Sequence, residues 1–90
     1  MTFNTEEFLE RACLDRATLE IWIEEEWLIP HRAAEGLSFS EVDLARARLI
    51  HDLIEDLGVN PEGVGIVLRL VDQVHGLRSA LAEVAASRMG

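Results

Sequence analysis

The chain has 90 residues, of which 49% are hydrophobic and 28% charged, a composition typical of one small globular domain. This length excludes a two-domain enzyme and any cofactor fold that needs a large parallel sheet. Seventeen Asp and Glu against eight Arg give a formal net charge of −9, whereas nucleic-acid-binding domains are normally basic. The acids concentrate near the start, where residues 1–30 hold eight acids and two arginines.

The single cysteine allows no intramolecular disulfide, and no apolar run approaches the ~18 residues of a membrane span. The sequence also lacks a basic segment followed by an apolar run, which is the pattern of a secretory leader. We therefore expect a soluble cytoplasmic protein, in which Cys13 is a small core residue of the first helix.

Capping residues predict two short helices at the start of the chain. Asn4, with Glu7 three residues later, is typical of a helix N-terminus, and this helix is expected to run to about Cys13. Asp15 caps a second helix, which ends before Pro30. Its apolar face comprises Leu19, Trp22 and Ile23, and Trp27 follows one turn later. In a domain with so few aromatic residues, we expect both tryptophans in the core rather than at an interface.

Residues 28–39 contain two breakers, Pro30 and Gly36, flanked by apolar residues. This pattern predicts a two-stranded ribbon with a short loop. Ser40, with Asp43 three residues later, opens a third helix, for which Gly58 is the natural C-terminal cap. Its apolar stripe comprises Val42, Leu49, Ile50, Leu53, Ile54 and Leu57.

Asn60 and Pro61 begin a last helix, which is expected to run to about Arg88. Along it, apolar residues recur at alternating intervals of three and four: Val67, Leu70, Val74, Leu77, Leu81 and Val84. This is heptad spacing, and so small a globule has too little mass to cover such a seam. We expect a homodimer through these residues; the alternative is that the seam packs on the third helix of the same chain.

The order of these elements resembles the winged-helix head of MerR-type DNA-binding regulators. Residues 26–30, Glu-Trp-Leu-Ile-Pro, lie where that family has Gly-Leu-hydrophobic-Pro, and residues 40–44 lie where it has Ser-x-x-Asp-Leu. The chain departs from the family at Glu20, which replaces a phosphate-contacting Arg, and in the ribbon, where residues 36–39 offer no cation. Because DNA affinity depends on cations at the phosphates, these departures count against DNA binding.

Residues 48–77, "RLIHDLIEDLGVNPEGVGIVLRLVDQVHGL", are similar to the signature of the CbpM-like chaperone modulators. In that family an amphipathic helix ends in Asp/Glu-Leu, and a Pro-containing turn leads to Gly-hydrophobic-hydrophobic, an apolar run and Asp. The matching residues are Asp56-Leu57, Pro61, Gly65-Ile66-Val67 and Leu70-Val71-Asp72. The resemblance covers roughly residues 8–81.

This resemblance implies an all-α, MerR-like winged helix-turn-helix with a minimal two-stranded wing and a long C-terminal helix. Residues 1–90 would form one domain, with the helix-turn-helix and wing in 1–39, the third helix in 40–58 and the dimerising helix in 60–88. The implied function is to bind the J-domain of a CbpA/DnaJ-type co-chaperone and to inhibit its Hsp70 co-chaperone and DNA-binding activities. The alternatives are a MerR-family transcriptional regulator and a dimerising adaptor of another complex.

A J-domain presents a basic helix beside its His-Pro-Asp loop, so an acidic surface suits it as a partner. The candidate contacts are Glu24, Glu25, Glu26, Asp52, Glu55, Asp56 and Asp72. The alternative is that they are solvated helix ends, with Asp72 interacting with Arg69 or with a neighbouring loop. No phosphate loop, nucleophile elbow or metal-ligand spacing occurs, since Cys13 and the three histidines lie far apart. We expect no enzyme activity, cofactor or metal.

Overall fold

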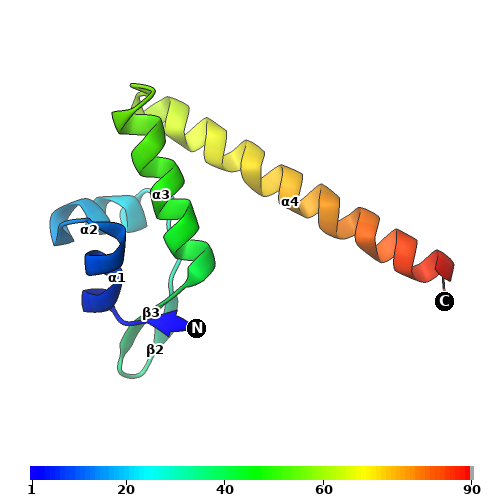
Figure 1. Cartoon of the computed structure of the whole chain (residues 1–90), viewed down its shortest axis with the longest axis horizontal. Coiled ribbons are helices and arrows are strands. Elements are labelled where there is room, and N and C mark those ends of the chain that lie inside the picture. Colours follow the sequence, from blue (N-terminus) through cyan, green and yellow to red (C-terminus); the bar gives the residue numbers. More distant parts are fainter. Residues whose placement is uncertain (90) are drawn as a thin grey trace. The chain divides into compact units, whose positions relative to one another are not determined.

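The computed structural model describes residues 1–89, which form four helices and three short strands (Figure 1). The chain divides into two compact units, Met1–Val59, here called the head, and Asn60–Gly90. The division falls where the sequence predicts the start of the last helix. That both units belong to one domain stays a prediction.

Side-chain caps start all three helices of the head, as the sequence predicts. Helix α1 spans Thr5–Ala12, α2 spans Arg16–Glu24 and α3 spans Glu41–Glu55. The Asn4 side chain accepts a 2.9 Å hydrogen bond from the Glu7 backbone N–H, and Glu7 accepts one from the Asn4 N–H in return. Ser40 and Asp43 form the same reciprocal capping box at α3. These caps satisfy backbone donors that a helix start leaves without partners.

The predicted two-stranded ribbon is present, but the sheet has three strands. Strands β2 (His31–Ala33) and β3 (Gly36–Ser40) pair antiparallel, with Ala33 opposite Gly36 at the turn. The additional strand is β1 (Thr2–Phe3), which pairs with the other edge of β3 so that Phe3 lies opposite Phe39. The predicted two-stranded wing is therefore confirmed, but it is part of a three-stranded sheet that the sequence did not predict. Two residues are too few for an alternating pattern to indicate a strand.

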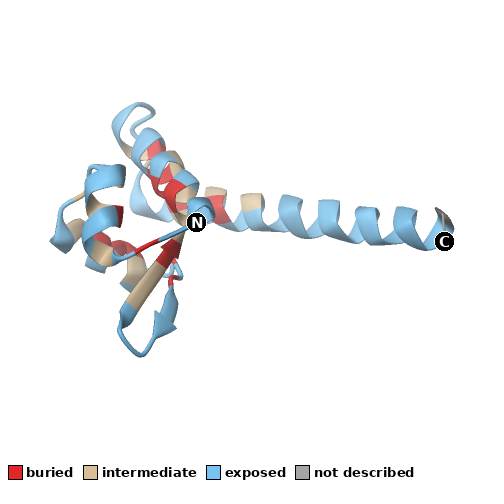
Figure 2. Ribbon diagram, turned by 60° about the horizontal axis from the view of Figure 1, so that its bottom comes forward, coloured by how far each residue is buried: buried red, intermediate tan, exposed pale blue. Residues whose placement is uncertain are grey.

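The core of the head lies where α1, α3 and β3 meet (Figure 2). The rings of Phe8 and Phe39 stack with centroids 4.2 Å apart, and both side chains are fully buried. Trp22 and Trp27 are also buried, as expected, and their rings pack against each other at 6.4 Å. Cys13 is exposed, so the expectation that it is a core residue was wrong. It ends α1 in a left-handed conformation with φ 56°, which turns the chain toward α2.

The buried face of α3 differs in phase from the predicted stripe. Its buried residues are Leu44, Ala47, Ile50 and Leu53, whereas Val42 is 75% exposed. The helix ends at Glu55, so Leu57 lies in the turn that leads to Gly58 and is 71% exposed. Ala47 was missed because a small side chain contributes little to a hydrophobic pattern, although it allows close packing.

The second unit consists of one helix, α4, which spans Pro61–Met89. The Asn60 side chain accepts a 2.8 Å hydrogen bond from the Gly63 N–H, and Pro61 takes the first helical position as predicted. Among the described side chains of α4, only Val64 and Leu68 are buried. From Arg69 to Arg88 every residue except the half-buried Val71 is exposed (Figure 2).

The burial pattern of α3 predicts that shortening two of its side chains to alanine will change stability by very different amounts. Ile50→Ala should lower the free energy of unfolding by about 2–5 kcal/mol, because it removes a fully buried side chain. Val42→Ala, on the exposed face, should change it by less than about 0.5 kcal/mol. Urea unfolding followed by circular dichroism measures both. Equal losses would show that Val42 packs in the core as well, contrary to the observed face.

Candidate functional site

Helices α1 and α2 form a helix-turn-helix joined by a tight turn. The Cys13 N–H donates to the Glu10 carbonyl, and the Leu14 N–H donates to the Leu9 carbonyl at 3.0 Å. Asp15 follows immediately as the N-cap of α2, and its Oδ1 accepts the Thr18 N–H at 2.7 Å. Both ends of the turn are thus fixed by hydrogen bonds, and α2 is held in a defined position in the head.

The outer face of α2 presents carboxylates and an apolar side chain. Glu20 and Glu24 lie one turn apart and are exposed, and Ile21 beside them is 55% exposed. Arg16, the one cation of α2, forms an ion pair with Glu6 of α1. The part of a helix-turn-helix that would face DNA therefore offers no unpaired cation on α2.

Helix α2 ends in an acidic turn, residues 24–26. The Glu26 N–H donates to the Ile23 carbonyl at 3.0 Å, and the Trp27 N–H donates to the Trp22 carbonyl at 2.9 Å, which is a Schellman motif. Glu26 has φ 61°, the left-handed conformation for which glycine is preferred at this position. The buried Trp27 anchors the turn, and its carbonyl accepts a hydrogen bond from Arg46 of α3. The three predicted contacts Glu24, Glu25 and Glu26 are all exposed on this ordered turn.

A second acidic patch lies in the last turns of α3. Asp52, Glu55 and Asp56 are exposed there, and His51 Nδ1 lies 3.9 Å from Asp52 Oδ1. Neither α2 nor α3 has a basic residue in its last turn. Carboxylates at these ends add to the negative end of each helix dipole, where cations are normally favourable. Both patches therefore concentrate negative potential.

The net negative charge of the chain comes entirely from the head. Residues 1–59 hold fourteen acids and five arginines, which give −9, whereas residues 60–90 hold three of each. Three arginines of the head have partners within it: Arg16 pairs with Glu6, Arg46 donates to the Trp27 carbonyl, and Arg11 lies 4.8 Å from the centre of the Phe3 ring. The head is an acidic body and the second unit is neutral.

The seventh predicted contact, Asp72, lies on α4 and is exposed. It belongs to the second unit, so it is described separately from the two patches of the head. The apolar seam on the same helix is exposed as well: Leu70, Val74, Leu77, Leu81 and Val84 have exposed fractions of 46–68%, and Val67 is half-buried. In the heptad frame of this seam Asp72 lies midway between Leu70 and Val74, two residues from each, at the position on the opposite side of the helix.

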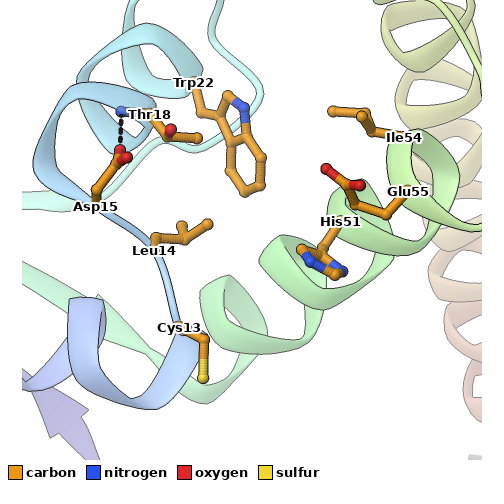
Figure 3. Close-up of a pocket in the computed structure, with 8 residues that line it drawn as sticks. All are labelled: Cys13, Leu14, Asp15, Thr18, Trp22, His51, Ile54 and Glu55. Atoms are coloured by element: carbon orange, nitrogen blue, oxygen red, sulfur yellow. Dashed lines mark hydrogen bonds between the residues drawn. The ribbon is translucent and has the colours of Figure 1, made fainter.

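A cleft of about 220 Å³ opens between α2 and α3, and no pattern in the sequence predicts it (Figure 3). Its lining combines residues from both helices and the turn before α2: Cys13, Leu14, Asp15, Thr18, Trp22, His51, Ile54 and Glu55. Only Glu55 had been identified as a candidate contact. Because the two groups are separated by about thirty residues, no spacing in the sequence links them.

Among the described residues, no group of three His, Cys, Asp or Glu side chains is arranged to hold a metal ion. Within the same part of the chain, no helix is long and apolar enough to cross a membrane.

A comparison with protein families matches residues 3–85 to the model for MerR HTH family regulatory proteins. The chain belongs to this family. No curated protein and no solved structure gives a significant match. The helix-turn-helix of this MerR-family member is α1 and α2, and its wing is the β2–β3 hairpin. The family assignment covers the fold and a regulatory role, while the chemistry of the exposed faces bears on what the protein binds.

The conformation of Glu26 leads to a prediction about stability. Glu26→Gly should raise the free energy of unfolding by about 0.5–1 kcal/mol, because glycine adopts the left-handed conformation without the steric cost of a side chain. Glu25→Gly is the matched control, since Glu25 has φ −75° and gains nothing from glycine. The control should be destabilised by up to about 1 kcal/mol. Thermal unfolding compares the two variants, and equal shifts would contradict the assigned turn.

Proposed function

We propose that this protein is a regulator that binds the J-domain of a CbpA/DnaJ-type co-chaperone through its acidic head. By occupying the basic face that the J-domain offers to Hsp70, it would inhibit the co-chaperone. The observation that carries this proposal is the outer face of α2, where Glu20, Ile21 and Glu24 are exposed and the one arginine is paired.

Electrostatics favours a basic protein partner over a nucleic acid. A head with net charge −9 repels the phosphate backbone of DNA, whose neutralisation by cations supplies much of the affinity of DNA-binding proteins. The same charge steers a basic surface toward the head and raises its association rate. The exposed Ile21 adds an apolar contact of the kind found at the centre of protein interfaces.

A MerR-type transcriptional regulator is the second candidate function. The family match, the helix-turn-helix and the wing favour it. Arg32 on the wing and Arg48 on α3 are exposed cations that such a function would use. This function requires binding to duplex DNA with an affinity that falls steeply as salt rises.

Calorimetric titration of the full chain with an isolated CbpA-type J-domain tests the main proposal. We expect saturable binding that weakens as salt rises from about 50 to 150 mM, because screening reduces attraction between the two charged surfaces. A triple variant of Glu24, Glu25 and Glu26 to Gln should bind more weakly than a control with Gln at Glu10, Glu35 and Glu41, which loses the same charge elsewhere. Absence of binding to the J-domain by the folded parent would refute the proposal.

The same titration with a mixed-sequence DNA duplex at low salt tests the second candidate. The non-specific part of DNA binding is independent of sequence, so the operator need not be known. We expect no binding. Detectable binding that salt abolishes would favour the transcriptional regulator instead.

We further propose that α4 pairs with α4 of a second copy. Heptad spacing and the exposure of the seam support this pairing, because a single helix in water leaves these side chains uncovered. The seam and the acidic head are different surfaces, so a dimer would present two heads. The outer heptad position of Asp72 is compatible with both roles.

Val74→Glu with Leu81→Glu should convert the dimer to monomer, because it places charges at the centre of the apolar seam. Ser79→Glu with Ala86→Glu is the control, since both residues are exposed on the outer side of the heptad. Sedimentation equilibrium gives the mass of each. A parent of monomer mass, or a seam variant that keeps the dimer mass, would rule out this interface.

A further inference from the structure

The cleft between α2 and α3 has an apolar lining with a carboxylate on each side (Figure 3). Trp22 of α2, which is 5% exposed, and Ile54 of α3 contribute apolar atoms, and Leu14 lies beside them. The Asp15 carboxylate lies at the α2 side, and the Glu55 carboxylate lies at the α3 side and points toward Trp22 (Figure 3). A volume of about 220 Å³ is suited to one long side chain rather than to a whole helix.

Both carboxylates of the cleft are suited to bind a cation. Hydrogen bonds from the side chain and the backbone of Thr18 hold the pKa of Asp15 below its ordinary value, so this group is charged at neutral pH. Its Oδ1 accepts the Thr18 N–H, and because an ionised carboxylate has about four lone-pair sites, it can accept further hydrogen bonds. Glu55 is exposed in the last turn of α3, where no basic residue accompanies it.

A cleft with this lining is complementary to a side chain that has an aliphatic stem and a cationic end. We propose that it receives one arginine or lysine side chain of the protein partner, with the stem against Leu14, Trp22 and Ile54 and the charge between Asp15 and Glu55. Burying such a stem while its charge meets a carboxylate is a common way for these residues to pack. An arginine fits especially well, because its planar guanidinium donates two parallel hydrogen bonds to one carboxylate.

This inference deepens the proposed function and rests on it for the identity of the partner. It assigns specificity to the cleft, whereas the acidic turn of residues 24–26 and the net charge act over longer distances. Removing charge at the cleft should therefore affect binding more than removing the same charge elsewhere.

A double variant, Asp15→Asn with Glu55→Gln, tests the cleft. Asparagine caps a helix as well as aspartate does, so α2 keeps its N-cap. The control is Glu35→Gln with Glu41→Gln, which removes the same net charge from exposed positions outside the lining of the cleft. In calorimetry with the isolated J-domain, we expect the cleft variant to bind about tenfold or more weakly, and the control to change by about twofold or less. Equal losses in the two variants would overturn the proposal.

Nuclear magnetic resonance of the two indole N–H groups provides a readout that does not require the J-domain to be the partner. A short blocked peptide of alternating arginine and alanine should shift the Trp22 resonance more than that of Trp27, which does not line the cleft. The same peptide with glutamine in place of arginine should shift neither, and the Asp15→Asn, Glu55→Gln variant should lose the response.

The two experiments separate the two proposals. If the J-domain does not bind but the arginine peptide shifts Trp22 selectively, the cleft is a site for basic side chains and the identity of the partner is wrong. If the peptide leaves Trp22 unchanged, or shifts it equally in the cleft variant, the cleft proposal is refuted whatever the J-domain does.

Discussion

The stack of Phe8 on Phe39 is the contact on which the head depends. It joins α1 to β3, which pairs with both other strands and leads directly into α3. Burial of the two rings therefore helps to hold the helix-turn-helix, the sheet and α3 in one arrangement. Aromatic rings bury large areas, so one such pair contributes a substantial part of the core of a unit as small as this one. The site residues are positioned on the frame that this pair holds.

Helix ends in the head have an unusual electrostatic design. α2 and α3 both end with carboxylates near the negative end of the helix dipole, and Glu26 occupies a position where glycine would be less strained. Each of these features lowers the stability of the folded head. Residues that are unfavourable for the fold but well ordered at the surface are reasonable candidates for binding. A basic partner would relieve the electrostatic part of this cost at both helix ends.

The MerR family match and the acidic surfaces point to different conclusions about the ligand. The family establishes a regulatory helix-turn-helix with a wing. A fold does not determine the ligand, which depends on the side chains at the exposed faces. In this chain the outer face of α2 carries Glu20, Ile21 and Glu24, and the cleft behind it is lined by Asp15 and Glu55. We therefore interpret the protein as a winged helix adapted to bind a basic protein surface.

The sequence by itself determined the starts of the helices, the turn positions and the apolar seam of α4. Those features depend on neighbours in the chain: Asn4, Asp15, Ser40 and Asn60 bond to backbone groups within three residues, and heptad spacing follows from helix geometry. Only the tertiary structure decided that β1 joins the sheet, that α3 buries Ala47 rather than Val42, and that Asp15 and Glu55 line one cleft. These features depend on contacts between residues far apart in the chain, for which local spacing carries no signal.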